Sequence, residues 1–314
     1  MTTPTDILKR HALLALQAAL EAGFEILEVY GRSFEVEHKA DSTPLTEADM
    51  RAHRRILALL ERYGERDCGE LPVLSEEASE IPYDRRELWE RYWLVDPLDG
   101  TKEFVKRNGE FTVNIAYLER GAPRAGVVYA PVLKRAYVGV AGEGAYRVDH
   151  VPGLDPASGD EAPRTGVESA HAGAPHASAE ARPGQLAAGV PVSWADLIAS
   201  ATPLPDSERA QRPFTVVASR SHMSPETERF IEELREEHPA VELISAGSAL
   251  KMCLVAEGAA DLYPRFAPTM EWDTAAGHAV CLAAGVEVSS WPAGRPLEYN
   301  KPDLVNPWFL VRRP

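Results

Sequence analysis

The sequence YWLVDPLDGT at residues 92–101 joins an apolar strand to a turn that is rich in oxygen ligands. Its apolar start predicts a buried strand, and Asp96 and Asp99 follow at the end of that strand. Pro97 restricts the backbone of the turn, so the Leu98 carbonyl can face the same point as both carboxylates. Ligation by oxygen alone suits Mg²⁺ or Mn²⁺. We therefore expect a divalent metal at the end of this strand.

Gly100 and Thr101 complete the turn with backbone amides and a hydroxyl group, which can bind an anion that the metal attracts. A second interpretation stays open at this point. Asp96 and Asp99 could serve only to accept hydrogen bonds from backbone amides in an Asx-type turn. The hexapeptide alone does not distinguish a metal site from such a turn.

Three further acidic residues lie at positions that could join the same site. Glu76 follows a short apolar strand, Asp273 precedes an apolar helical run, and Asp49 lies in the first turn of a predicted helix. Each also has a structural interpretation: a solvated loop for Glu76, a helix N-cap for Asp273, and half of a capping box for Asp49. Position along the chain leaves both interpretations open.

The first half of the chain has the pattern of two helices followed by strands. Apolar residues recur at helical spacing from residue 6 to about 30 and from 46 to about 63. Short runs rich in Val, Ile and Tyr then predict neighbouring antiparallel strands at residues 71–74, 92–95, 113–118, 125–129 and 136–140, with a hairpin turn at 121–124.

The second half begins with a change of composition. From about residue 150 to 212, Pro, Gly, Ala, Ser and His dominate, which predicts a flexible insertion. Strands then alternate with helices, which is typical of a mixed or parallel sheet: strands at 214–218, 241–245 and 261–263, and helices after Ser224, at 248–257 and at 274–284. We expect an N-terminal α+β domain at residues 1–149 with most metal ligands, the insertion at 150–212, and a C-terminal α/β domain at 213–314.

Composition excludes several classes of function. The 314-residue chain has 33 Lys and Arg against 48 Asp and Glu, and its net charge of −15 disfavours nucleic acid polymers and anionic lipid. Three separated cysteines without a C-x-x-C motif predict neither disulfides nor a zinc site, which favours a reducing, cytoplasmic location. No apolar stretch has the length of a membrane span. Segment 8–26 has helical spacing, so we expect an amphipathic helix rather than a signal peptide.

Taken in chain order, these motifs resemble the lithium-sensitive inositol monophosphatase superfamily. The resemblance rests on Lys39, residues 46–49 and 76–77, DPLDGT at 96–101 and WDTAAG at 272–277. Within the superfamily the chain is most similar to the CysQ-type 3'(2'),5'-bisphosphate nucleotidases, through SRSH at 219–222, GSALK at 247–251 and LYPRF at 262–266. Only the segment around 150–212, longer than is usual for the family, has no counterpart. The resemblance implies an α+β or α/β fold, a layered α-β-α-β-α sandwich.

The resemblance also implies a metal site and a nucleophile. It implies two Mg²⁺ ions, which Mn²⁺ can replace, and leaves open a third, weaker ion near Asp49. The implied ligands are Glu76, Asp96 and the Leu98 carbonyl for the first ion, and Asp96, Asp99 and Asp273 for the second. Thr101, oriented by Asp49, and Glu76 would position and deprotonate an attacking water, so no covalent phosphoenzyme is needed.

Four more residues match positions that contact the nucleotide in the resembled enzymes: His222, Ser248, Lys251 and Arg265. The implied reaction is removal of the 3'-phosphate of adenosine 3',5'-bisphosphate, with its sulfated precursor as a further candidate. Two basic side chains favour this doubly phosphorylated substrate over inositol monophosphate or a sugar bisphosphate, which remain alternatives. A non-catalytic metal- or nucleotide-binding regulator is another alternative, and the complete carboxylate set argues against it. The sequence leaves the oligomeric state open.

Overall fold

The structure is a computed structural model that describes residues 3–31, 36–38, 44–67, 70–78, 80–149, 193–206, 212–218 and 223–314. The predictions for Lys39, for the SRSH motif with His222, and for residues 150–192 lie outside the described residues. Among the residues it describes, no helix is both long and apolar enough to cross a membrane.

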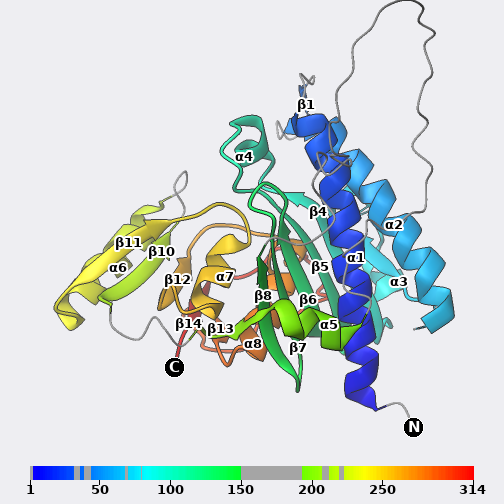
Figure 1. Ribbon diagram of the computed structural model, residues 1–314. Helices are drawn as coiled ribbons and strands as arrows, with labels where there is room; N and C mark the ends of the chain where they lie inside the picture. Colours follow the sequence, from blue (N-terminus) through cyan, green and yellow to red (C-terminus); the bar gives the residue numbers. More distant parts are fainter. Residues whose placement is uncertain are drawn as a thin grey trace, which may run out of the picture.

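Two long helices near the start of the chain cover one face of a large sheet (Figure 1). Helix α1 (Pro4–Tyr30) begins at a capping box in which Thr3 and Asp6 exchange hydrogen bonds. Helix α2 (Glu47–Asp67) packs beside it, and a short antiparallel pair, β1 (Val36–His38) and β2 (Pro44–Thr46), lies between them in the chain. Both predicted helices are confirmed.

The covered sheet has seven strands in the spatial order β3-β4-β5-β6-β7-β8-β9. Their bounds are Val73–Ser75, Arg91–Asp99, Thr112–Glu119, Ala122–Ala130, Arg135–Val140, Gly144–Asp149 and Thr202–Leu204. Neighbours are antiparallel except β3 and β4, which are parallel. The antiparallel prediction was wrong for that pair, because a crossover through a 3₁₀ helix (Glu76–Ala78) and α3 (Tyr83–Arg86) joins them instead of a hairpin.

Two further boundaries differ from the prediction. The β5–β6 hairpin turns at Arg120 and Gly121, both with positive φ, which is the two-residue turn that matches strand twist. The segment predicted as an insertion up to residue 212 contains helix α5 (Trp194–Ser200) and strand β9. Trp194 is buried and donates a hydrogen bond to Glu143 over 3.1 Å. The few apolar residues of α5 and β9 lie in a segment that is otherwise polar, so its overall composition did not predict these two elements.

The second sheet has five strands in the order β11-β10-β12-β14-β13. In chain order they are β10 (Phe214–Ala218), β11 (Val241–Ser245), β12 (Leu262–Arg265), β13 (Glu287–Ser290) and β14 (Phe309–Arg312). Strand β10 is parallel to β11 and β12, while β14 is antiparallel to β12 and β13, so the mixed sheet is confirmed. Three helices accompany it: α6 (Pro225–Glu237), α7 (Leu250–Ala256) and α8 (Glu271–Ala283).

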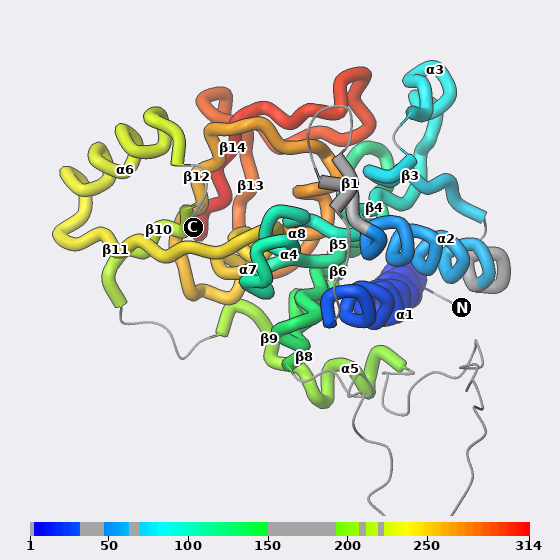
Figure 2. The backbone as a smooth tube through the Cα atoms, turned by 90° about the horizontal axis from the view of Figure 1, so that it is seen from above, coloured from blue at the N-terminus to red at the C-terminus, as the bar shows by residue number. Residues whose placement is uncertain are grey.

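Three hydrophobic cores lie between five layers, which Figure 2 shows from above. The first core fills the space between α1, α2 and one face of the seven-stranded sheet. The second joins the other face of that sheet to α7, α8 and the five-stranded sheet. The third lies between the five-stranded sheet and α6. This order of layers is the predicted α-β-α-β-α sandwich.

Helix α8 lies unusually close to strand β6. A Cβ atom added at Gly126 would approach the Ala276 carbonyl oxygen to 2.6 Å, closer than real Cβ atoms come. The absence of a side chain at this position therefore lets the helix backbone rest on the sheet. Because Asp273 lies in the first turn of α8, this contact helps to set where that carboxylate stands.

Candidate active site

Strand β4 carries Asp96 into the protein interior and ends at Asp99. Asp96 lies opposite Asn114 on β5, and the register shifts between Asp96 and Asp99. The Leu98 amide donates a hydrogen bond to Asp96 Oδ1 over 3.1 Å, so the predicted alternative of an Asx-type contact is present. One amide hydrogen bond does not compensate a carboxylate that is 1% exposed. The contact therefore does not by itself explain why Asp96 is buried here.

The DPLDGT turn is held against the C-terminal half of the chain at Gly100. This residue has φ 93° and precedes helix α4 (Thr101–Val105), a conformation that favours glycine. A Cβ atom at Gly100 would lie 2.3 Å from Ser248 Oγ. That hydroxyl lies 2.8 Å from the Asp99 carbonyl oxygen and 2.7 Å from the Glu110 carbonyl oxygen.

The carboxylates predicted as ligands influence one another. Burial raises the pKa of Asp96 well above its usual range, and the charges of Glu76, Asp99, Asp273 and Asp49 add to this in that order. Burial and then Asp99 raise the pKa of Asp273 to about 8. Side chains from four separate stretches of the chain therefore share one electrostatic environment.

The pKa of Asp99 is raised by burial, but two groups act in the opposite direction. The positive charge of Lys251 has the larger effect, followed by a hydrogen bond from the Asn114 side chain. The Asn114 amide lies 3.3 Å from Asp99 Oδ2. Lys251 and Asn114 therefore offset part of the effect that burial has on the pKa of Asp99.

The carboxylate oxygens of this site are of the kind that binds a divalent cation, although they do not yet surround a single point. Within the described ranges, no three His, Cys, Asp or Glu side chains already stand in the arrangement of a metal site. Buried carboxylates that repel one another gain most from a cation, because it removes the repulsion that raises their pKa values. Oxygen-only ligands of this kind match the preference of Mg²⁺.

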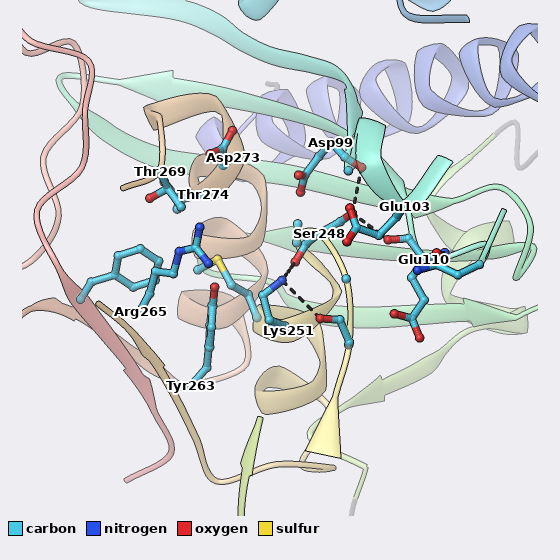
Figure 3. Close-up of a pocket in the computed structure, with 17 residues that line it drawn as sticks. Asp99, Glu103, Glu110, Ser248, Lys251, Tyr263, Arg265, Thr269, Asp273 and Thr274 are labelled. Atoms are coloured by element: carbon cyan, nitrogen blue, oxygen red, sulfur yellow. Dashed lines mark hydrogen bonds between the residues drawn. The ribbon is translucent and has the colours of Figure 1, made fainter. Parts of the chain in front are cut away.

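A pocket of about 170 Å³ opens beside these carboxylates, and Figure 3 shows its lining. Asp99 and Asp273 lie on one side, and Lys251, Tyr263 and Arg265 lie on the other. The Arg265 guanidinium points toward Asp273. The pocket thus places an acidic wall opposite a basic one.

The two basic residues of the pocket differ in how many of their hydrogen-bond donors the protein already uses. Lys251 Nζ donates to the Ser248 carbonyl over 2.7 Å and lies 3.4 Å from the Ala246 carbonyl oxygen. Arg265 Nη2 donates to the Pro268 carbonyl over 3.1 Å. The Nε atom of Arg265 is buried and has no hydrogen-bond partner in the described part of the protein. Arg265 therefore keeps an unused donor for a ligand.

The structure places the predicted site residues in different ways around Asp96. The pocket lining includes Asp99, Gly100, Ser248, Lys251, Arg265 and Asp273. Glu76 and Asp49 act on Asp96 by charge, Leu98 contacts it through its backbone, and Thr101 begins α4. His222 lies outside the described residues. No described contact tests the role of Thr101.

Sequence reasoning missed several residues of this region, among them Asn114, Glu103, Glu110 and Thr269. A usable signal existed for Asn114. Residues directly opposite one another in paired strands share a face, and the antiparallel pairing of β4 with β5 places Asn114 opposite Asp96. Glu103 lies in the short helix α4, and Glu110 and Thr269 lie outside helices and strands, where no such period applies.

A five-layered sandwich with clustered carboxylates beside a basic pocket defines the class of metal-assisted phosphatases. The chain belongs to the inositol monophosphatase family, whose sequence signature matches residues 9–308. It is 40% identical over 298 residues to the 3'(2'),5'-bisphosphate nucleotidase CysQ of Salmonella typhimurium, covering 94% of this chain and 96% of that protein. The Escherichia coli K12 protein of the same name is 39% identical over the same coverage.

Solved structures agree with this assignment. CysQ from Bacteroides thetaiotaomicron, a bacterial member of the inositol monophosphatase family, is 44% identical, with a TM-score of 0.76 over 97% of each chain. An inositol monophosphatase from Thermotoga maritima shares the fold at 20% identity, with a TM-score of 0.59 over 95% of this chain and 89% of that one.

Proposed function

We propose that the chain is a Mg²⁺-dependent 3'(2'),5'-bisphosphate nucleotidase, which hydrolyses the 3'-phosphate of adenosine 3',5'-bisphosphate to give AMP and phosphate. The similarity to CysQ proteins over nearly their whole length supports the reaction. The observation that carries the substrate class is the pocket with Asp99 and Asp273 facing Lys251 and Arg265. A substrate with two phosphates can occupy both walls.

In this proposal the acidic wall holds the phosphate that is cleaved. Its ligands for divalent ions are Glu76, Asp96, the Leu98 carbonyl, Asp99 and Asp273. Bound ions would neutralise the phosphate and lower the pKa of a water. Thr101 would hold that water, Glu76 would accept its proton, and Asp49 would orient the Thr101 hydroxyl. The amides of Gly100 and Thr101 donate to the phosphate oxygens.

The basic wall binds the phosphate that is retained. Arg265 is the main contact, because its buried Nε has no partner among the described residues and a guanidinium group matches the geometry of a phosphate. Lys251 already donates to carbonyl oxygens, so it contributes mainly positive charge. A monophosphate offers nothing for this wall to bind.

Replacement of Arg265 by Ala tests the substrate assignment. A charge-assisted contact to a phosphate is worth roughly 1.5–3 kcal/mol, so kcat/KM for adenosine 3',5'-bisphosphate should fall about ten- to a hundredfold. Turnover of inositol monophosphate should change little. Steady-state kinetics with Mg²⁺ on both substrates measures the two effects.

A matched control is Arg229→Ala, which removes an exposed arginine that pairs with Glu226 on α6. It should leave both substrates unaffected. Equal losses on both substrates in Arg265→Ala would show that Arg265 supports the fold or the metal site instead. A parent enzyme that prefers inositol monophosphate would contradict the assignment to bisphosphate nucleotides.

A further inference from the structure

Ser248 lines the pocket, but its side chain is already engaged by the protein. Its hydroxyl lies between the carbonyl oxygens of Asp99 and Glu110, at 2.8 and 2.7 Å, as the dashed lines in Figure 3 show. A serine hydroxyl has one proton to donate, and both neighbours can only accept. Ser248 therefore has no donor left for a phosphate, and its lone pairs would repel phosphate oxygens.

The backbone of Ser248 has an uncommon conformation. Its φ is 51°, in the left-handed region that residues with a Cβ atom seldom adopt. Such a conformation is strained for a residue with a Cβ atom, so its surroundings must hold it in place. Lys251, a buried residue, does so by donating from Nζ to the Ser248 carbonyl over 2.7 Å.

The same short segment also reaches the Asp99 side chain. The Ala249 amide hydrogen-bonds to that carboxylate and lowers its pKa, as the Lys251 charge does. From the opposite side, Asn114 Nδ2 approaches Asp99 Oδ2 to 3.3 Å, and Thr112 Oγ1 donates to Asn114 Oδ1 over 2.9 Å. That second bond sets the orientation of the Asn114 amide, so its NH₂ group faces Asp99. Asp99 is thus held between the two halves of the chain.

We propose that Ser248 is a positioning residue for the metal site rather than a substrate contact: its hydroxyl fixes the Asp99 backbone so that the Asp99 carboxylate can bind a divalent cation. The inference rests on the proposed metal site. Because Ser248, Ala249 and Lys251 also line the pocket, the nucleotide and the cation would bind against one segment.

The test compares Ser248→Ala with Ser200→Ala. Ser200 Oγ also lies near two backbone carbonyl oxygens, those of Asp196 and Leu197 at 3.4 and 3.2 Å, but in helix α5. Titration calorimetry with Mn²⁺ and no nucleotide should show about tenfold weaker binding in Ser248→Ala, as is typical when a group that orients a metal ligand is lost. Ser200→Ala should bind Mn²⁺ as the parent does. At saturating Mg²⁺, KM for the bisphosphate should be nearly unchanged in Ser248→Ala.

Ser248→Gly separates the hydroxyl from the backbone strain. It removes the same hydrogen bonds but favours the left-handed conformation, so it should fold at least as well as Ser248→Ala and bind Mn²⁺ equally weakly. Parent-like Mn²⁺ affinity in Ser248→Gly would overturn the inference, as would a raised KM with unchanged Mn²⁺ affinity in Ser248→Ala. A parent protein that binds no Mn²⁺ would instead overturn the proposed metal site itself, and this inference with it.

Discussion

Asp96 lies in an environment that disfavours its own charge. It is buried, and four neighbouring carboxylates raise its pKa further. In the metal-free protein this arrangement costs free energy, because a buried charge beside like charges has neither water nor a counter-ion. Residues kept at such a cost are common at functional sites. The proposed cation explains the arrangement, since it would reverse the sign of the local field.

Asp96→Asn should therefore separate activity from stability. The variant keeps an oxygen for the Leu98 amide but loses the charge that both proposed ions share, so we expect kcat/KM to fall at least a thousandfold. The metal-free variant should melt at the same or a higher temperature than the parent, because one repelling charge is gone. Kinetics with Mg²⁺ and thermal melting in EDTA measure the two effects.

Asp303→Asn is the matched control for Asp96→Asn. Asp303 Oδ1 accepts a hydrogen bond from the amide two residues on, Val305, over 2.9 Å, but on the surface. It should change neither activity nor melting temperature appreciably. Activity of Asp96→Asn within tenfold of the parent, or clear destabilisation in EDTA, would leave the Asx-type turn as the role of Asp96.

At the scale of elements, helix α8 connects the two halves of the molecule. It packs on β5, β6 and β7 of the large sheet and on α7, and its first turn carries Asp273, which accepts a hydrogen bond from the Met270 amide over 2.9 Å. The helix begins at Glu271, three residues before the predicted start. The predicted alternative that Asp273 is the N-cap was therefore wrong: Met270 is the N-cap, and Asp273, at the third helical position, accepts the hydrogen bond from its amide.

Gly126→Ala should displace α8 from the sheet. Its Cβ would lie 2.6 Å from the Ala276 carbonyl and 2.7 Å from the Ala279 Cβ, and neither belongs to a flexible side-chain end. Overpacking of this kind costs typically about 1–3 kcal/mol. We expect that loss in the free energy of unfolding by urea, together with weaker Mn²⁺ binding as Asp273 moves.

Gly142→Ala controls for the loss of a glycine. Gly142 has φ 79° and no atom within 4 Å of an added Cβ, so only backbone strain of about 1–2 kcal/mol applies. Its Mn²⁺ affinity should equal that of the parent. Unchanged Mn²⁺ binding in Gly126→Ala would mean that Asp273 does not depend on how α8 sits on β6.

At the scale of the whole molecule, two buried histidines connect stability to pH. His11 lies in the first core, where its ring stacks on Tyr117 at 4.0 Å between centroids, and His278 lies in the second, 2.9 Å from the Tyr299 hydroxyl. Burial lowers the pKa of each from 6.5 to about 4. Below pH 6.5 the unfolded chain takes up these protons before the folded protein does.

Each histidine should therefore contribute stability that is fully present above pH 6.5 and is lost as the pH falls toward about 4. The loss is about 3 kcal/mol per group from shifts of this size. Urea unfolding between pH 7 and pH 4.5 should show a much smaller pH dependence in His11→Phe/His278→Gln than in the parent. His238→Gln, at the end of α6, should leave the dependence as it is; an equally steep loss in the double variant would contradict this account.

Local sequence pattern was enough to predict most helices and strands and the acidic residues that follow strand ends. The layered sandwich was predicted from the family resemblance. Periodicity and strand-end chemistry depend on neighbours in sequence. The same pattern did not show that β3 and β4 are parallel, that residues 194–204 are ordered, or that β8, β13 and β14 exist, because these depend on partners far along the chain.

Only the tertiary structure shows whether a polar side chain binds the protein's own backbone or remains available to a ligand. Ser248 and Lys251 lie in one short motif that predicts substrate contacts. In the folded protein, however, the Ser248 hydroxyl and the Lys251 ammonium group each contact two backbone carbonyl oxygens. Arg265 instead keeps a buried, unpartnered Nε within the described structure. A motif specifies which donors and acceptors are present, whereas packing of the two sheets around α8 determines which of them the protein itself uses and which remain for a ligand.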